Sequence, residues 1–174
     1  LNDDVLRHLD KGHSAADVAE AFDITEQAGI ALRPSLLPFS PWETLESYLD
    51  LLAFFEERDL IEHIDPVHLS IRLLIPPGSA LLDDPESNDW VGELDAAAYT
   101  YCWQHPDPCM DALQARVAAV VEKGENCKAD PIDTFFHVKA LALAMRGQDI
   151  SIPRAVQHYG PHKVIPHLTE SWFC

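Results

Sequence analysis

The feature that most constrains the fold is a strand–helix–strand pattern between Gly29 and Ser79. Two apolar runs, at 30–39 and 67–75, flank a longer run with Ser40 or Thr44 as its N-cap. The longer run has apolar residues at helical spacing: Leu45, Tyr48, Leu49, Leu52 and Phe55. A helix that connects two strands in this way brings them side by side in the same direction. The pattern therefore predicts a βαβ unit with parallel pairing.

Both predicted strands carry polar side chains on one face. By the period-two rule, His68, Ser70 and Arg72 share a face of the second strand, and Arg33 and Ser35 share a face of the first. A parallel strand that is covered on both sides should be apolar throughout. We therefore expect one face of this sheet to pack on helices. The other face should line a cavity that holds an anionic ligand, as in a β/α barrel.

Helical signals lie on both sides of this unit. Upstream, Asn2 or Asp3 caps a short helix, and Ser14 with Asp17 resembles a capping box for a second helix, which Gly29 ends. Downstream, the apolar spacing predicts three helices, around 94–102, 110–121 and 130–145. We therefore predict an α/β fold in three parts. The C-terminal part of a partial TIM-type (β/α)6 barrel spans 1–82, an acidic linker spans 83–89, and an α-helical C-terminal domain spans 90–174.

The composition excludes some classes of function. The chain has 29 acidic and 12 basic residues and a formal net charge of −17. Binding to nucleic acid or to an anionic membrane needs a basic surface, so we expect neither partner. No apolar run reaches the length of a membrane span. Four cysteines at irregular spacing, without a signal peptide, indicate a cytoplasmic protein.

Three short motifs, in order, resemble the C-terminal part of a radical S-adenosylmethionine (radical SAM) enzyme. Residues 1–6 (LNDDVL) and 11–18 (KGHSAADV) resemble the family's segment after its fourth strand, which has a KGHT-x-x-D turn. Residues 41–44 (PWET) resemble the PGET turn after the fifth strand, with Trp42 in place of glycine. Residues 74–81 (LIPPGSAL) resemble the PGTPL exit from the sixth strand.

The end of the chain resembles a narrower group, the CUAEP/CCAEP-tail radical SAM proteins, through residues 168–174 (LTESWFC). Chains of that group close with Cys, then selenocysteine or Cys, then Ala-Glu-Pro, and this sequence stops at Cys174. Because a stop codon encodes selenocysteine, we expect the coding DNA to continue with TGA and codons for Ala-Glu-Pro. The start at Leu1, in place of Met, likewise indicates a chain that was cut into.

The resemblance implies an enzyme whose [4Fe–4S] cluster cleaves S-adenosylmethionine to give a 5′-deoxyadenosyl radical, which abstracts hydrogen from an unidentified small-molecule or peptide substrate. Cobalamin, bound by an N-terminal domain, is an optional further cofactor of the group. The family holds its cluster with a Cys-x3-Cys-x2-Cys loop. The four cysteines here (Cys102, Cys109, Cys127 and Cys174) lack this spacing. We therefore expect an inactive fragment whose missing partner is the N-terminal part of the same protein.

The candidate cofactor-binding residues on the two predicted strands are Arg33, Ser35, Ser70 and Arg72. A guanidinium binds a carboxylate through two parallel hydrogen bonds, so the arginines suit the methionyl carboxylate or the substrate. Pairing with one of the many acidic side chains is the alternative. The serines suit ribose hydroxyls, or they simply fill a narrow barrel interior.

The remaining candidates come from the resemblance. Asn2 occupies the position of a ribose-contacting residue, although a plain helix cap explains it equally well. Leu74 and Ile75 occupy the positions whose backbone flanks adenine, or they end an ordinary apolar strand. Cys174 with a following selenocysteine or Cys would form a redox-active pair, whereas alone it is an ordinary terminal thiol.

Two other classes of function stay open. A non-enzymatic helical interaction domain predicts a compact monomer, whereas a barrel fragment predicts exposed sheet edges and aggregation. A small metal-binding protein is suggested by Cys102, His105 and Cys109, with Asp107 as a fourth ligand, and by the group His158, His162 and His167. Proline residues stiffen the first site, and a Gly-Pro pair interrupts the second.

Overall fold

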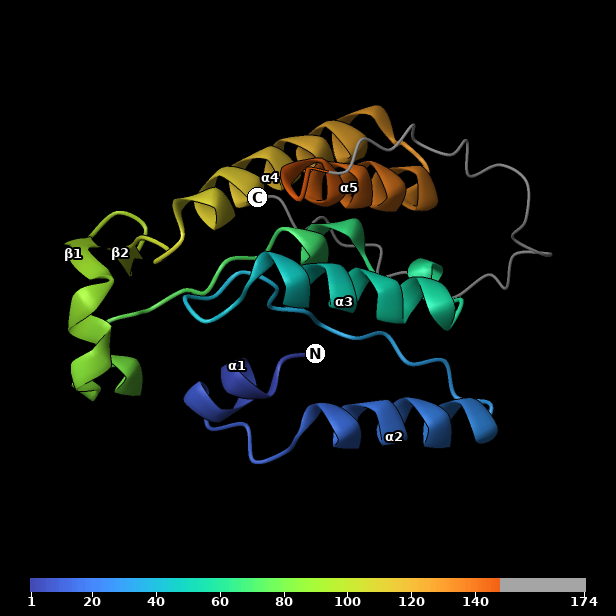
Figure 1. Cartoon of the computed structure of the whole chain (residues 1–174), viewed down its shortest axis with the longest axis horizontal. Coiled ribbons are helices and arrows are strands. Elements are labelled where there is room, and N and C mark those ends of the chain that lie inside the picture. Colours follow the sequence, from blue (N-terminus) through green and yellow to red (C-terminus); the bar gives the residue numbers. More distant parts are fainter. Residues whose placement is uncertain (148–174) are drawn as a thin grey trace.

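The computed structural model describes residues 1–147, which form a mostly helical domain with a single hairpin in the described range. The helices are α1 (Asp3–His8), α2 (Ala15–Gln27), α3 (Leu45–Glu57), α4 (Pro108–Cys127) and α5 (Pro131–Met145), and the hairpin pairs β1 (Val91–Asp95) with β2 (Thr100–Trp103). Short 3-10 turns are η1 (Ile61–His63), η2 (Pro66–Leu69), η3 (Ala80–Asp83) and η4 (Pro85–Asp89). Figure 1 shows α1 and α2 in one layer, α3 in the middle and α4 with α5 in a third.

Side-chain caps explain where the helices begin. Asn2 caps α1, and Ser14 with Asp17 forms the predicted capping box of α2. The Ser14 backbone and side-chain donors lower the pKa of the Asp17 carboxyl. Thr44, the second of the two predicted caps, begins α3, and Asp130 begins α5 with proline at the first helical position. The predicted helices around 45–55, 110–121 and 130–145 are confirmed.

A continuous apolar core joins the helical layers. Tyr48, Leu52 and Phe55 of α3 are almost fully buried and share this core with apolar residues of α4 and α5: Met110, Leu113, Val117, Val121, Phe135, Val138 and Ala142. The ring centroid of Phe22 on α2 lies 5.5 Å from that of Phe54 and 6.0 Å from that of Phe55, both on α3. Residues on both sides of the predicted linker at 83–89 therefore contribute to one core, and the division into domains stays a prediction.

The predicted barrel is wrong, because the described residues form no barrel-like parallel sheet. The segments 30–39 and 67–75 do run in parallel across α3, yet they share only the bridge between Phe39 and Arg72. The Phe39 amide donates to the Ile71 carbonyl, and the Leu73 amide donates to the Phe39 carbonyl. Pro34 and Pro38 remove amide donors from the first segment, so a longer ladder is not available to it.

Two predicted elements have a different conformation for local reasons. Asp65 accepts a hydrogen bond from the Val67 amide, and this cap turns 66–69 into η2, so the predicted shared face of His68, Ser70 and Arg72 does not form. The predicted helix at 94–102 is instead the β1–β2 hairpin. The Asp95 carboxylate accepts from the amides of Ala97 and Ala98 and closes the turn.

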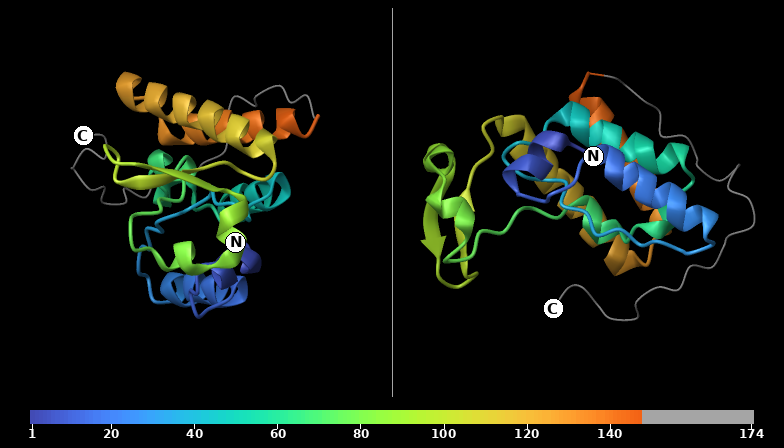
Figure 2. Two further views of the ribbon diagram at one scale, coloured as in Figure 1. Left: turned by 90° about the vertical axis from the view of Figure 1, so that its left-hand side faces the viewer. Right: turned by 90° about the horizontal axis from the view of Figure 1, so that it is seen from below.

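The hairpin and η4 form a separate end of the molecule, to one side of the helical layers (Figure 2). This end has its own apolar cluster around Leu73, Ile75 and Trp103. In the described part of the chain, no helix combines the length and the apolarity needed to cross a membrane.

Candidate functional site

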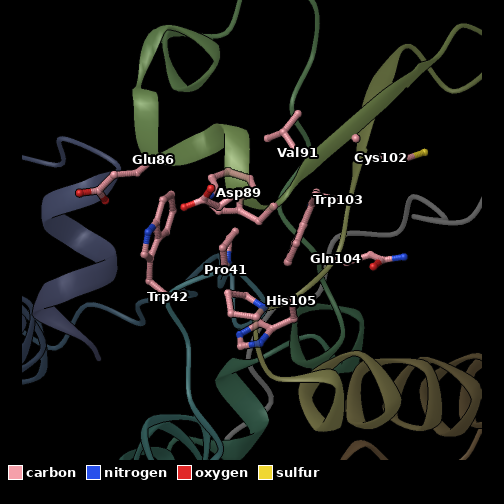
Figure 3. Close-up of a pocket in the computed structure, with 12 residues that line it drawn as sticks. Pro41, Trp42, Glu86, Asp89, Val91, Cys102, Trp103, Gln104 and His105 are labelled. Atoms are coloured by element: carbon pink, nitrogen blue, oxygen red, sulfur yellow. The ribbon is translucent and has the colours of Figure 1, made fainter.

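A cleft of about 910 Å³ lies between the hairpin end and the turn that precedes α3. Its lining comes from three segments distant in sequence: 41–42, 86–92 and 102–106. Figure 3 shows Trp42 and Trp103 on opposite sides of the cleft, with Pro41 between them and the Asp89 carboxylate near Trp42. Tryptophan side chains and a carboxylate thus supply the main binding surfaces.

Three tryptophans form a connected series along this cleft. The Trp90 ring lies 5.5 Å from Trp42 at an interplanar angle of 81°, and 6.0 Å from Trp103 at 80°. Edge-to-face contacts of this kind are the favoured geometry of neighbouring aromatic rings. The Trp103 indole N–H also donates to the Leu73 carbonyl at 2.8 Å, which fixes this ring against the 71–75 segment.

The outer faces of two of these rings are already covered. The His8 imidazole stacks on Trp42 with ring centroids 4.4 Å apart and an interplanar angle of 4°. The Arg72 guanidinium carbon lies 3.6 Å from the centre of the Trp103 ring. These contacts hold the two indoles in place from outside.

Arg72 is bound within the chain. Its Nη1 lies 2.5 Å from the Asp111 carboxylate, and its Nη2 donates to the Trp103 carbonyl at 2.7 Å. The alternative of pairing with an acidic side chain is therefore the arrangement observed. Arg33 is half-buried on the 30–39 segment. A direct contact of either arginine with a cofactor stays a prediction.

The other predicted binding residues are dispersed. The Asn2 carbonyl oxygen caps α1, and its amide nitrogen lies 3.4 Å from the Trp42 carbonyl and 3.4 Å from the buried Glu43 carboxylate. Ser70 donates to the Val67 carbonyl at 2.9 Å, and the Ser35 hydroxyl lies 3.4 Å from His68.

Leu74 and Ile75 differ sharply in exposure. Leu74 is 70 % exposed, whereas Ile75 is fully buried and pairs with β2 through its amide and its carbonyl. None of the seven predicted cofactor-binding residues lines the aromatic cleft. Cys174 lies outside the described residues.

His105 forms the floor of the cleft and is neutral. Its Nδ1 accepts from the Asp107 amide at 2.9 Å, so the proton resides on Nε2, which donates to the Glu43 carbonyl at 2.8 Å. A zinc ligand needs a free nitrogen lone pair, so this geometry does not support the suggested zinc site with Cys102 and Cys109. The Asp107 charge and side-chain hydrogen bond raise the pKa of the Cys109 thiol. The suggested site at His158, His162 and His167 lies outside the described residues.

Among residues 1–147, one other group of side chains could hold a metal ion. His8, Asp84 and Glu86 place their ligand atoms within 4.8 Å of one another, and they come from α1 and from η4 with its cap. Figure 3 shows the Glu86 carboxylate on the side of Trp42 that faces away from the cleft. Imidazole with two carboxylates suits a first-row divalent metal.

The sequence analysis did not identify the residues of the cleft. Trp42 stands out in the sequence only as a replacement for glycine in the PWET motif, and Trp90 and Trp103 belong to no motif. A possible signal was the frequency of tryptophan, since three of the four in the chain lie between 42 and 103. Their convergence depends on the hairpin, which the sequence pattern had indicated as a helix.

No family model matches the sequence, and comparisons with curated proteins and with solved structures gave no match either. The radical SAM resemblance therefore stays a prediction.

Proposed function

We propose that this chain is the C-terminal portion of a radical SAM enzyme and is inactive alone. The intact enzyme would use a [4Fe–4S] cluster to cleave S-adenosylmethionine and generate a 5′-deoxyadenosyl radical in the cytoplasm, with cobalamin as an optional further cofactor. The support comes from the order of three sequence motifs and from where their segments lie. The partial barrel that the same resemblance implied is wrong for the described residues, so the motifs alone support the proposal.

The observation that carries the proposal is the meeting of the three motif segments. Leu9, just before the KGHS motif, Trp42 of the PWET motif, and Leu81 at the end of the LIPPGSAL motif all pack on the apolar cluster around Ile75 and Trp103. Asn2 also contacts the backbone of the PWET motif through the Trp42 carbonyl. This convergence supports the proposal together with the order of the motifs along the chain.

The chain does not supply the reactive centre. A [4Fe–4S] cluster needs several thiolates at one site, and the only cysteines before residue 147 are Cys102, Cys109 and Cys127, all of them free and exposed. The missing ligands would come from the N-terminal part of the same protein.

The coding DNA provides the first test. We expect an in-frame Cys-x3-Cys-x2-Cys motif upstream of Leu1, and TGA followed by Ala-Glu-Pro codons downstream of Cys174. The second test is expression of the whole reading frame without oxygen, followed by reduction with S-adenosylmethionine present. We expect 5′-deoxyadenosine from the whole protein and none from residues 1–174. A reading frame without the upstream motif would overturn the proposal.

A second candidate function is metal binding, which the group of His8, Asp84 and Glu86 favours. Titration with Co²⁺ alone, followed by its visible absorption, tests this function. His8→Ala should weaken the tightest site at least tenfold, whereas His13→Ala, an exposed histidine of the neighbouring turn, should not. Equal Co²⁺ affinity in the wild type and His8→Ala would exclude the site.

A further inference from the structure

The aromatic cleft combines three features that together define a class of ligand. Its walls are the indole rings of Trp42, Trp90 and Trp103, with Trp90 nearly perpendicular to the other two. Asp89 contributes an exposed carboxylate that Figure 3 shows near the Trp42 ring. Its volume of about 910 Å³ is enough for a small organic molecule.

The electrostatics of the lining favour a cation. Asp89 is the carboxylate on the cleft side of Trp42, whereas the Glu86 carboxylate lies beyond that ring, and none of the described lining residues is a lysine or arginine. The one histidine of the lining, His105, is neutral because Nδ1 accepts a backbone hydrogen bond while Nε2 donates one. The net charge of −17 adds a general attraction for cations.

The Arg72 guanidinium behind Trp103 does not oppose this charge balance. Arg72 lies against the Trp103 ring, but its guanidinium is paired with Asp111 at 2.5 Å. That contact shows that the Trp103 π system already holds a cation in this fold. The faces turned toward the cleft present the same negative π density to a ligand.

The chemistry of the walls selects the kind of cation. A primary ammonium needs three hydrogen-bond acceptors to replace its water, whereas the three indole walls provide none and leave mainly the Asp89 carboxylate to accept. A quaternary ammonium has no N–H group, and its methyl groups spread the charge over a surface that packs well on indole. We propose that the cleft binds a quaternary ammonium ion between Trp42 and Trp103, with its charge balanced by Asp89. This proposal does not rest on the radical SAM proposal.

The test compares choline with its neutral carbon isostere, 3,3-dimethylbutanol. Both are titrated into residues 1–174 carrying Trp172→Phe, so that every remaining tryptophan lies in the cleft, and the indole N–H signals are followed by NMR. Sodium chloride at equal ionic strength is the blank. We expect saturable choline shifts at Trp42, Trp90 and Trp103, and binding of the isostere at least tenfold weaker.

Two variants locate the site. Asp89→Asn should weaken choline binding about three- to tenfold, because it removes the balancing charge. Asp83→Asn removes the same charge from a nearby exposed residue that does not line the cleft, and it should leave binding unchanged. Trp90→Leu, checked for wild-type circular dichroism, should abolish the shifts at Trp42 and Trp103. Equal affinity for choline and the isostere, equal effects of the two aspartate variants, or no saturable shift at 100 mM choline would each overturn the proposal.

Discussion

Arg72 offers the sharpest test of how the hairpin end is attached to the helical core. Its side chain makes an ion pair with Asp111, donates to the Trp103 carbonyl, and stacks on the Trp103 ring. The side chains of Arg72 and Asp111 are 26 % and 32 % exposed, so water weakens the ion pair only in part. We therefore expect the loss of Arg72 to have a measurable cost.

The magnitude follows from the three contacts. The charged hydrogen bond to the carbonyl contributes about 1 kcal/mol, the partly exposed ion pair about 0.5 to 1 kcal/mol, and the stacking on indole about 0.5 to 1 kcal/mol. Arg72→Ala should thus lower the free energy of unfolding by about 2 to 3 kcal/mol. With a urea dependence of about 2 kcal/mol per M, the midpoint of unfolding should fall by about 1 to 1.5 M.

The assay is urea unfolding followed by circular dichroism, with Arg7→Ala as the matched control. Arg7 pairs with Asp4 at 2.9 Å, but these side chains are 69 % and 65 % exposed, so the control should change stability by less than about 0.5 kcal/mol. Arg72→Lys should recover less than half of the loss, because ammonium lacks the planar fork. A double-mutant cycle with Asp111→Asn should give a coupling energy of about 1 kcal/mol. An Arg72→Ala effect as small as that of Arg7→Ala would refute the reasoning.

Three further predictions concern single groups. Burial raises the pKa of Tyr48 far above 10.0, so the contribution of its neutral hydroxyl to the free energy of unfolding is complete below about pH 10 and is lost as the pH rises further. Tyr48→Phe should lower the free energy of unfolding by about 1 to 2 kcal/mol at pH 7, because the hydrogen bond to the Leu69 carbonyl is lost. It should also reduce the loss of stability between about pH 10 and 11, and an unchanged pH slope in urea unfolding would contradict this. Ser40→Ala should leave stability unchanged or raise it by about 1 kcal/mol, because the buried hydroxyl has no hydrogen-bond partner among the described residues. A clear loss of stability in thermal unfolding would contradict this. Asp107→Asn keeps the cap of α4 but removes the charge that raises the pKa of Cys109, so iodoacetamide should label this thiol several-fold faster at about pH 7.5. An equal or slower labelling rate, measured by mass spectrometry, would show that the Asp107 charge is not the cause of the raised pKa.

Local signals in the sequence were enough for the helices, because their caps are encoded within a few residues. Asn2, the pair Ser14 and Asp17, and Asp130 before a proline all begin helices as predicted. Strand pairing is different, since it depends on partners that the local pattern does not specify. Apolar residues at 67–75 are compatible with a strand, yet the Asp65 cap makes 66–69 a 3-10 turn.

The hairpin shows how an apolar period can mislead. Leu94, Ala97, Ala98 and Tyr101 are spaced as on a helix, but the Asp95 carboxylate binds two amides and Tyr99 takes a φ of 54°, which together reverse the chain. Side-chain hydrogen bonds to the backbone therefore outweigh periodicity over such a short segment. Once the hairpin forms, it brings Trp103 to Trp90 and creates a cleft that the helical interpretation could not contain.

The 71–75 segment connects the two experiments on stability and on binding. On one side it bonds to Phe39 in the helical core, and on the other it bonds to β2, where the Tyr101 amide donates to the Ile75 carbonyl and the Trp103 indole donates to the Leu73 carbonyl. Loss of Arg72 should therefore lower stability and also weaken choline binding, since one wall of the cleft loses its support.

Asp89 is exposed and lies outside this network, so Asp89→Asn should weaken choline binding at unchanged stability, and Arg7→Ala should alter neither. If Arg72→Ala lowered stability but left the affinity for choline intact, Trp103 would not be a wall of the binding site. The cation would then have to lie against Trp42 and Trp90 alone.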